Sequence, residues 1–162
     1  MGSNPTSSAM NTEYEAAMRV ALEHAELAAV AGEVPVGAVV ICAGEIIAAR
    51  HNEREIRNDP TAHAEILALR DAANARGTWH LENCALVVTL EPCIMCAGAL
   101  INSRIGAVIF GAADLKGGAT SSLYNVCTDP RLNHNPLVIH GLLQDESALL
   151  LRKFFESKRA GN

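Results

Sequence analysis

Residues 84–110, CALVVTLEPCIMCAGALINSRIGAVIF, contain two short apolar runs on either side of a segment with helical character. The runs at Cys84–Leu90 and at residues 107–110 are suited to strands that are buried on both faces. A helix is expected over residues 93–103, because the missing N–H of Pro92 costs nothing where a helix begins. A strand, a helix and a second strand in this order predict two parallel neighbours in one sheet.

The rest of the chain continues the alternation of helical and strand patterns. Thr12, with Glu15 three residues later, predicts the start of a helix, and Gly32 predicts its end. The dipeptide Ala43-Gly44 between two apolar runs predicts a hairpin. In chain order, the remaining expected elements are a helix at 12–31, strands at 36–42 and 45–49, a helix at 62–75, a strand at 137–140 and a helix at 145–159.

Residues 111–136 form a long polar connection rich in Gly, Ser, Asn and Asp. A connection of this length rarely lacks structure of its own inside a compact domain, so we expect a short helix and part of the function there. Together the elements predict an α/β fold with a five-stranded mixed sheet and helices on both faces.

Length and composition indicate one domain. The 162 residues, 49% of them hydrophobic, are enough for a single core, which we expect over residues 12–159. Residues 1–11 are expected to be a disordered leader or a vector-derived remnant, because the first nine residues are polar. No apolar run reaches the roughly 18 residues of a membrane span, so we expect a cytoplasmic protein without a membrane partner.

The five cysteines are relevant to a metal cofactor, and the net charge of −5 is relevant to an RNA partner. An odd number of cysteines does not fit a closed set of disulfides, and in a reducing compartment the thiols are free to bind metal. An acidic balance does not predict nucleic-acid binding by itself, so an RNA partner would have to contact local basic patches.

Cys93 and Cys96 are three residues apart at the start of an expected helix and therefore share one face of it. The unpaired N–H groups and the dipole of a helix start favour thiolates, which makes the pair a suitable half-site for zinc. Taken alone, this C-x-x-C pair is equally consistent with a redox pair or with two buried thiols.

His63 and Glu65 stand at the start of the preceding expected helix. A lone histidine or glutamate there is more often a capping residue or a complement to the helix dipole. Together, however, His63, Cys93 and Cys96 supply three zinc ligands and leave the fourth tetrahedral position open for water, as in catalytic sites. Glu65 would then move protons between that water and a leaving amine. The pattern H-x-E followed by P-C-x-x-C is typical of zinc nucleobase deaminases.

Beyond this motif, the sequence resembles the bacterial tRNA-specific adenosine deaminase family from Thr12 onward. The matching segments are EVPVGAV at 33–39, HN at 51–52, DPTAHAEI at 59–66, VTLEPCIMCAGA at 88–99, SRIG at 103–106, FGA at 110–112, NH at 133–134 and FF at 154–155. The zinc motif is shared by many deaminases, whereas the flanking segments are more specific to this family.

The resemblance implies a three-layer α/β/α cytidine-deaminase-like fold and a homodimer. It implies hydrolytic conversion of adenosine to inosine at the wobble position of a tRNA anticodon. It also implies one Zn²⁺ per chain, bound by His63, Cys93 and Cys96, with Glu65 as the proton shuttle.

Four further residues are assigned to substrate binding through the resemblance. Asn52 matches a residue that contacts the target nucleoside, although by itself Asn52 reads as a turn residue that closes the hairpin. Asp114 and Asn133 match positions near the flipped nucleotide and its neighbours. Lys116, together with Ser122 and the C-terminal helix, lies where the family holds the tRNA anticodon stem-loop.

Two positions depart from the family pattern, because Ala113 and Asn135 stand where the family often has basic residues. Candidate replacements for these phosphate contacts are Arg131, Arg152, Lys153, Lys158 and Arg159. The last four form a basic patch near the C-terminus, which a solvated helix face would explain equally well.

Two other functions remain open. A deaminase of free bases such as guanine or cytosine would use the same motif, and only the resemblance outside that motif argues against it. A non-catalytic zinc or RNA-binding module is the second alternative. The intact Glu65 and the lack of a fourth ligand with paired spacing oppose it.

Overall fold

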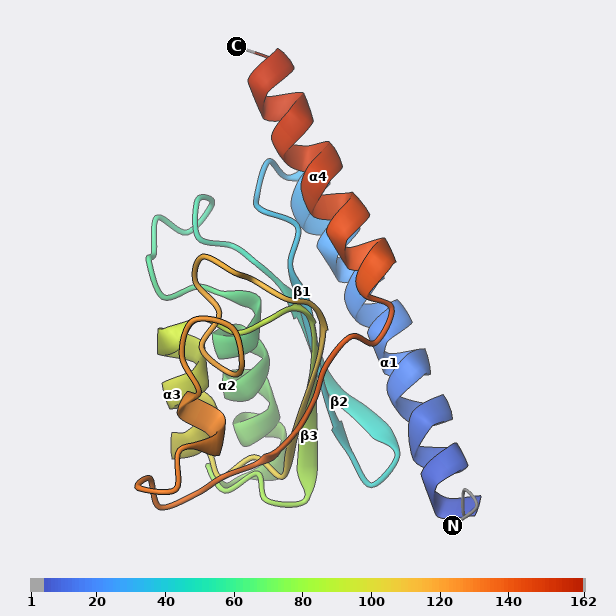
Figure 1. Ribbon diagram of the computed structural model, residues 1–162, viewed down its shortest axis with the longest axis vertical. Helices are drawn as coiled ribbons and strands as arrows, with labels where there is room; N and C mark the ends of the chain where they lie inside the picture. The colour runs from blue at the N-terminus through green and yellow to red at the C-terminus, as the bar shows by residue number, and fades with distance from the viewer. Residues whose placement is uncertain (1–4, 162) are drawn as a thin grey trace.

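A computed structural model describes residues 5–161, with side chains from Thr12 onward (Figure 1). In chain order, the elements are α1 (Pro5–Val30), β1 (Gly37–Cys42), β2 (Glu45–His51), α2 (Ala64–Arg76), β3 (Cys84–Leu90), α3 (Ile94–Asn102), β4 (Ala107–Ala112), the 3-10 helix η1 (Val126–Thr128), β5 (Leu137–Ile139) and α4 (Gln144–Ala160). The short helix expected within residues 111–136 is η1.

The strands form one mixed sheet in the order β2-β1-β3-β4-β5. Strand β1 is antiparallel to β2 and β3, whereas the pairs β3–β4 and β4–β5 are parallel. The parallel β3–β4 pair confirms the expectation from residues 84–110, since α3 carries the chain back across one face of the sheet. In the hairpin, Ala43 and Gly44 have φ angles of 52° and 80°, as tight turns between twisted antiparallel strands require.

Helices cover both faces of the sheet, and the alternation of side chains along the strands divides the core in two. Val39 and Ile41 of β1 belong to the same buried cluster as Met18 of α1. Val40 of β1 and Leu86 of β3 belong to the cluster formed with α2 and α3. Figure 1 shows α1 and α4 side by side on one face of the sheet and α2 and α3 on the other. The expected three-layer α/β/α fold is therefore confirmed.

Gly37 allows α1 to pack closely against the start of β1. A Cβ atom at this position would lie 1.9 Å from the carbonyl oxygen of Ala21. Glycine inside a strand often marks such a close backbone approach. The contact holds α1 beside the segment 33–36, which leads into the candidate site.

The first helix begins earlier than the sequence predicted. Helix α1 starts at Pro5, so the backbone of residues 5–11, expected to be a disordered leader, is helical, and the expected N-cap Thr12 lies inside the helix. Apolar periodicity does not reveal this extension, because a helix that has already nucleated adds further residues at little cost. The first four residues of the expected leader lie outside the described residues.

The other differences are confined to the ends of elements. Strand β2 continues to His51, two residues beyond the expected end, and α2 begins at Ala64 because His63 is its N-cap. Helix α3 likewise begins at Ile94, one residue after its N-cap Cys93. Within residues 5–161, no helix is both long and apolar enough to cross a membrane.

Candidate active site

The first turns of α2 and α3 lie next to one another, and each is preceded by a residue with extended backbone. His63 is the N-cap of α2, with φ −74° and ψ 150°, and Cys93 is the N-cap of α3, with φ −75° and ψ 179°. Neither side chain makes a capping hydrogen bond to its own helix. The imidazole and the thiol are therefore available to meet each other between the two helices.

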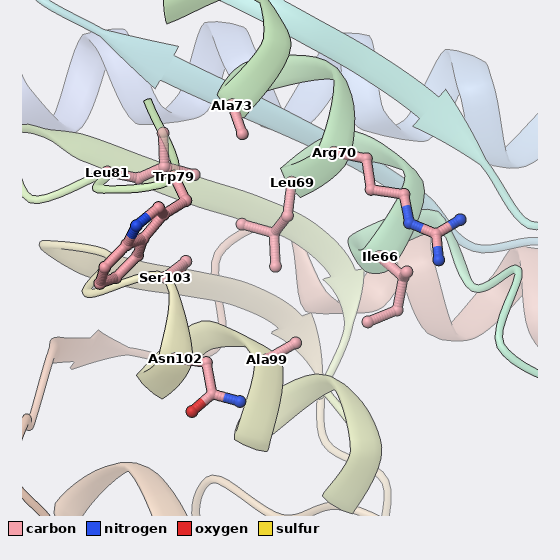
Figure 2. Close-up of a pocket in the computed structure, with 9 residues that line it drawn as sticks. All are labelled: Ile66, Leu69, Arg70, Ala73, Trp79, Leu81, Ala99, Asn102 and Ser103. Atoms are coloured by element: carbon pink, nitrogen blue, oxygen red, sulfur yellow. The ribbon is translucent and has the colours of Figure 1, made fainter. Parts of the chain in front are cut away.

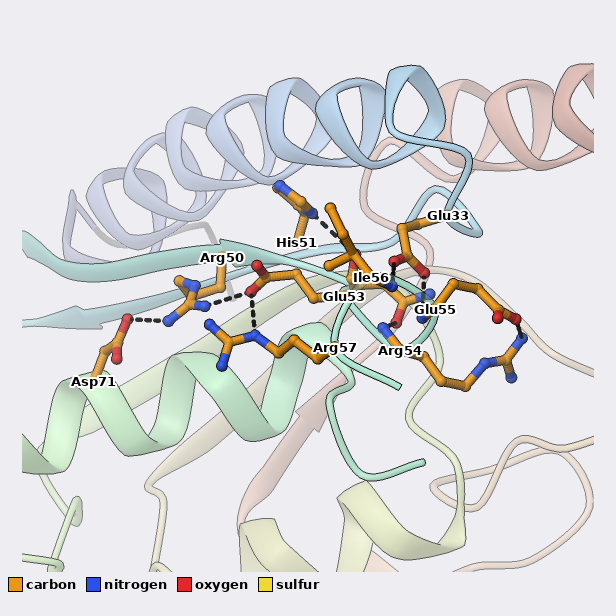
Figure 3. Close-up of polar contacts among 10 residues, drawn as sticks. Glu33, Arg50, His51, Glu53, Arg54, Glu55, Ile56, Arg57 and Asp71 are labelled. Atoms are coloured by element: carbon orange, nitrogen blue, oxygen red, sulfur yellow. Dashed lines mark hydrogen bonds and ion pairs between the residues drawn. The ribbon is translucent and has the colours of Figure 1, made fainter. Parts of the chain in front are cut away.

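A turn-rich segment, residues 52–62, carries the chain from β2 to His63. The buried carboxylate of Glu33 accepts hydrogen bonds from the backbone N–H groups of Glu55 and Ile56 at 2.9 and 2.7 Å (Figure 3). Hydrogen bonds from backbone N–H groups to a charged acceptor are among the stronger ones in proteins. They tie the segment that delivers His63 to the end of α1.

His63, Cys93 and Cys96 bring three potential ligand atoms together. Nδ1 of His63 lies 3.6 Å from Sγ of Cys93 and 3.5 Å from Sγ of Cys96, and all three atoms lie within 4.8 Å of one another. Tetrahedral zinc, with bonds of about 2.3 Å to sulfur and about 2.0–2.1 Å to nitrogen, separates such ligands by about 3.6 Å. The three side chains therefore fit a tetrahedral metal ion. No fourth His, Cys, Asp or Glu joins them among the described residues.

Cys93 and Cys96 differ in their protonation, although both belong to the cluster. The hydrogen bond from Cys96 lowers the pKa of the Cys93 thiol to about 4, with further help from His63 and against the effect of burial. The hydrogen bond to Cys93, and then burial, raise the pKa of the Cys96 thiol. One thiolate is thus ready without a metal, and a bound cation would allow the second thiol to ionise.

Glu65 lies in the first turn of α2 and is buried, with an exposed fraction of 4%. Burial is the largest influence on this carboxyl and raises its pKa to about 7. A carboxyl group that titrates near neutrality can both accept and donate a proton, as general acid–base catalysis requires. Because His63 is the N-cap and not part of the helix, both residues reach the same site although they are only two positions apart.

A cavity of about 130 Å³ opens beside this cluster. Loops and both helix starts contribute to its lining, which consists of Val34, Val36, Asn52, Arg54, His63, Ala64, Glu65, Leu90, Glu91, Cys93 and Asp114. Apolar walls that carry a few oriented polar groups and a carboxyl with a shifted pKa are typical of a small-molecule site.

Asn52 is held at both ends of its side-chain amide in the wall of this cavity. Its Nδ2 donates to the carbonyl oxygen of Val34 at 3.3 Å, and its Oδ1 accepts from the N–H of Arg54 at 3.1 Å. Asn52 therefore acts as a turn residue, as its position after the hairpin suggested. An amide nitrogen carries two N–H groups, so the same bonds also orient one donor that Val34 does not use.

A single buried carboxylate, that of Glu91, organises the loop that follows β4. It accepts hydrogen bonds from the backbone N–H groups of Asp114, Thr120, Ser121 and Ser122 at distances of 2.9–3.2 Å. It also accepts from the hydroxyl groups of Thr120 and Ser122. Burial by itself would raise the pKa of this carboxyl, but the hydrogen bonds hold it below its ordinary value. The N–H and the hydroxyl group of Ser122 thus both donate to Glu91, which lies outside this loop.

A larger hollow, of about 670 Å³, adjoins the cavity and shares Val34, Leu90 and Asp114 with it. Lys116 and Arg159 are exposed and line this hollow, Lys116 from the loop after β4 and Arg159 from α4. The hollow therefore extends from the cavity beside His63, Cys93 and Cys96 to the basic end of α4.

Asn133 does not join the other predicted substrate-binding residues. It is exposed and lines neither of these two hollows. Asn135, two residues later, donates to the carbonyl groups of Cys127 and Asp129 at 3.1 and 2.9 Å, so it braces the loop. Arg131, one of the candidate cations, is paired with Asp129 at 2.7 Å. The side chains of Asn135 and Arg131 therefore bind other residues of the same loop.

The candidate cations of α4 point to different surroundings. Arg159 lines the hollow beside the site, whereas Lys153 lines a groove between α1 and α4. Nζ of Lys158 lies over the ring of Phe154, 5.4 Å from its centre. The basic patch seen in the sequence is thus divided between two sides of the helix.

Sequence reasoning did not single out Glu33 and Glu91, although both shape the site. Their exposed fractions are 1% and 2%. A signal was present for Glu91, which directly follows the buried run of β3, because an acidic residue in such a place must find hydrogen-bond donors. Its donors lie 23–31 positions away, however, and nothing local identifies them.

Comparison with known proteins identifies close relatives of the chain. Residues 12–159 match the MafB19-like deaminase family. The tRNA-specific adenosine deaminase of Bacillus subtilis (strain 168) is 47% identical over 148 residues, which covers 91% of this chain and 92% of that protein. A solved structure from a study of A-to-I editing by tRNA:A34 deaminases at the wobble position of transfer RNA has a TM-score of 0.81 and 44% identity, covering 83% of this chain and 98% of the other. A structure of guanine deaminase from Nitrosomonas europaea has a TM-score of 0.75 and 31% identity, covering 86% and 83%.

Proposed function

The chain belongs to the MafB19-like deaminase family, and from this premise we propose that it is a tRNA-specific adenosine deaminase. It hydrolyses the C6 amino group of the wobble adenosine in an anticodon, which gives inosine. The observation that carries the proposal is the cluster of His63, Cys93 and Cys96, which lies beside the buried carboxyl of Glu65 at the wall of one cavity.

We expect His63, Cys93 and Cys96 to hold one zinc ion per chain. Separations of 3.5–3.6 Å between the imidazole nitrogen and the two sulfurs suit this ion, and nitrogen with thiolate is a donor set that zinc favours. When bound, zinc supplies an activated water molecule at neutral pH. A structural zinc would require a fourth side-chain ligand, and the described residues place none beside the other three.

Glu65 moves the proton in this proposal. Its buried carboxyl, with a pKa of about 7, takes a proton at one oxygen and returns it to the departing ammonia. The reaction consumes one water molecule and releases one ammonia for each adenosine converted. Burial thus gives Glu65 the proton affinity that both half-steps need.

The cavity receives the base after it has left the anticodon stack. Val34 and Leu90 supply apolar surface for the ring, and Asn52 supplies an amide whose orientation is fixed by two hydrogen bonds. Extruding a base from a single-stranded loop requires less free energy than extruding it from a duplex, because no base pair has to be broken.

The hollow beside the cavity is where we place the neighbouring nucleotides. Asp114 lies at the border of the two spaces, and Lys116 and Arg159 supply positive charge for phosphate groups. The half-exposed ring of Phe155, which also lines the hollow, offers a surface for base stacking. Asn133 would contact the RNA only beyond this hollow.

We further propose a homodimer. Figure 2 shows a mainly apolar hollow between α2 and α3, to which Ile66, Trp79 and Ala99 contribute. Trp79 is 57% exposed, and exposed apolar side chains gathered on one face are typical of a protein interface. Sedimentation velocity at micromolar concentration should show twice the mass of one chain, and a monomer there would contradict this part of the proposal.

We assign the protein to the cytoplasm. All five cysteines of the described residues are free thiols, which suits a reducing compartment. Cys93 and Cys96 must remain reduced in order to bind a metal ion.

The deciding experiment incubates the zinc-loaded protein with a tRNA that carries adenosine at the wobble position. Parallel reactions contain guanine or cytosine as free bases. We expect inosine at the wobble position and at no other adenosine, with one ammonia released for each inosine. Consumption of guanine without formation of inosine would replace the proposal by a free-base deaminase. One zinc per chain with no ammonia from any substrate would indicate a binding module.

A further inference from the structure

Cys42 and Cys84 face one another at the end of the sheet that is remote from the candidate active site. Cys42 ends β1 and Cys84 begins β3, and they are directly opposed partners in the antiparallel β1–β3 ladder. Both are free thiols, with exposed fractions of 5% and 3%. Strand β3 runs from Cys84 toward the segment that bears Cys93, so this pair takes no part in the candidate active site.

Cys42 and Cys84 do not exchange backbone hydrogen bonds with each other, because the backbone groups of Cys84 have other partners. The N–H of Cys84 donates to the carbonyl group of Leu81, and the carbonyl group of Cys84 accepts from the N–H of Gly106, both at 3.0 Å. Antiparallel partners that do not exchange backbone hydrogen bonds have Cα atoms about 4.5 Å apart, which lies within the range of about 4.4–6.8 Å found for disulfides. The two Sγ atoms are accordingly close, at 2.8 Å.

Arg76 makes the two thiols chemically unequal. Its Nη1 lies 2.6 Å from Sγ of Cys42, and the thiol of Cys84 donates toward the same sulfur. Two donors, the guanidinium group of Arg76 and the thiol of Cys84, thus point at the sulfur of Cys42. Burial and the hydrogen bond to Cys42 raise the pKa of the Cys84 thiol to about 12, so Cys84 keeps its proton. Cys42 is therefore suited to attack first and Cys84 to react second.

We propose that Cys42 and Cys84 form an oxidation site that closes to a reversible cross-strand disulfide, with a hydroperoxide as the oxidant. The sulfur of Cys42 attacks one oxygen of hydrogen peroxide and becomes a sulfenic acid, and the other oxygen leaves as water with the proton of the thiol. The Cys84 thiol then attacks the sulfenic sulfur, the S–S bond forms, and the sulfenic oxygen leaves as water with the thiol proton. Two electrons pass from the thiol pair to one peroxide, and a dithiol reductant reverses the change.

The disulfide would close a loop that contains β2 and α2, and with them His63 and Glu65. A cross-link over a loop of this length restricts the unfolded chain and so stabilises the folded one. We expect the melting temperature to rise by about 5 °C or more on oxidation. The residues of the candidate active site are not consumed, because they lie at the other end of β3.

Peptide mapping separates this disulfide from any that involves the metal ligands. Cleavage after glutamate places Cys42 in peptide 34–45 and the other four cysteines in peptide 83–146, because the Glu91–Pro92 bond resists the protease. Fragmentation of the linked peptides in the mass spectrometer, at the bond before Pro92, then separates Cys84 from the other three cysteines. The zinc-loaded full chain is treated with hydrogen peroxide, alkylated and digested without reduction. We expect peptides 34–45 and 83–146 to be joined through Cys42 and Cys84, with two hydrogens fewer than the same peptides with free thiols at these two positions. Dithiothreitol should separate them again.

Two variants and a matched control test the assigned order of reaction. Arg76→Ala should slow the linkage several-fold, because Cys42 loses its neighbouring cation, whereas Arg70→Ala on the same helix should oxidise like the wild type. Cys84→Ala should leave a sulfenic acid on Cys42 that dimedone traps, and should abolish the rise in melting temperature.

The proposal is overturned if Cys42 and Cys84 stay unlinked while Cys93, Cys96 or Cys127 becomes oxidised. It is also overturned if Arg70→Ala slows the linkage as much as Arg76→Ala does. Because the mapping uses the wild-type chain, its result stands even where a variant fails to fold.

Discussion

The carboxylate of Glu91 accepts a hydrogen bond from the backbone N–H of Asp114 at 3.0 Å, across 23 positions of the sequence. Glu91 is followed directly by Pro92 and Cys93, and Asp114 lies in the loop that borders the cavity. One buried side chain thus connects the segment proposed to bind the metal with the loop proposed to contact the substrate.

Replacing Glu91 by Ala should destabilise the protein and release this loop. Four backbone N–H groups and two hydroxyl groups would lose their acceptor, and a buried donor left unsatisfied costs about 1–3 kcal/mol. Water would reach some of these groups, so we expect the free energy of unfolding in urea to fall by roughly 3–5 kcal/mol. Amide hydrogen exchange of residues 114–122 should accelerate. The exposed Glu55→Ala variant is the control, and unchanged exchange in Glu91→Ala would show that other contacts hold the loop.

Replacing Glu65 by Gln should separate metal binding from turnover. The amide keeps the volume of the carboxyl but cannot accept the proton, so the rate should fall at least about 100-fold. Zinc content, measured by atomic absorption, should remain near that of the wild type. The control is Glu82→Gln at an exposed position. Turnover that persists in Glu65→Gln would remove Glu65 from the proposed mechanism.

Replacing Cys96 by Ala should remove the metal together with the activity. The variant keeps only His63 and Cys93 of the three clustered ligands, and two ligands hold zinc weakly. Cys127→Ala, which removes another buried thiol outside the cluster, should keep both. Equal zinc content in the two variants would mean that the ion binds elsewhere.

Lys116→Ala and Arg159→Ala should each weaken tRNA binding and reduce its salt dependence. Each variant removes one cation from the hollow beside the cavity, so the slope of log K against log salt should fall by about one. Arg19, which is exposed and paired with Glu15 on α1, provides the control variant Arg19→Ala. Unchanged slopes for Lys116→Ala and Arg159→Ala would place the RNA on another surface.

An ion pair between β2 and the following segment should make stability depend on pH. Arg50 donates to both Glu53 and Asp71 (Figure 3). Burial alone would raise the pKa of the Glu53 carboxyl, but the hydrogen bond from Arg50 brings it below its ordinary value. The unfolded chain therefore takes up this proton at a higher pH than the folded one, and the stabilisation present above that range is lost as the pH falls.

Glu53→Gln should accordingly flatten the decrease in melting temperature between about pH 5 and pH 3. Glu45→Gln, at an exposed position in the same strand as Arg50, is the control. Parallel curves for the wild type and Glu53→Gln would show that Glu53 makes no such contribution.

Signals within a few residues were sufficient to predict most elements of the fold. The Ala43-Gly44 turn joins β1 to β2, as expected from its place between two apolar runs. The H-x-E and C-x-x-C motifs each stand at a helix start. In each case the local structure, a tight turn or the start of a helix, depends only on residues that are neighbours in the sequence.

Relations between distant segments were not predictable in the same way. The pairing of Cys42 with Cys84 depends on the register of β1 against β3, which no short pattern specifies. The role of Glu91 depends on a loop that returns to it after β4. Asn133 was assigned through resemblance, and within one chain it lies apart from both hollows. Tertiary packing decides all three positions.

The hydrogen bonds of Glu91 determine which residues of the loop after β4 can be substituted without moving the loop. Four of the six hydrogen bonds come from the main chain, so the path of the loop is largely independent of the exposed side chains at Ala113, Leu115 and Lys116. Gly118 is an exception, since a Cβ there would lie 2.3 Å from the carboxyl carbon of Glu91. Selection or design can therefore exchange the outward side chains of the loop, and with them the proposed contacts to RNA, without moving the residues around His63, Cys93 and Cys96.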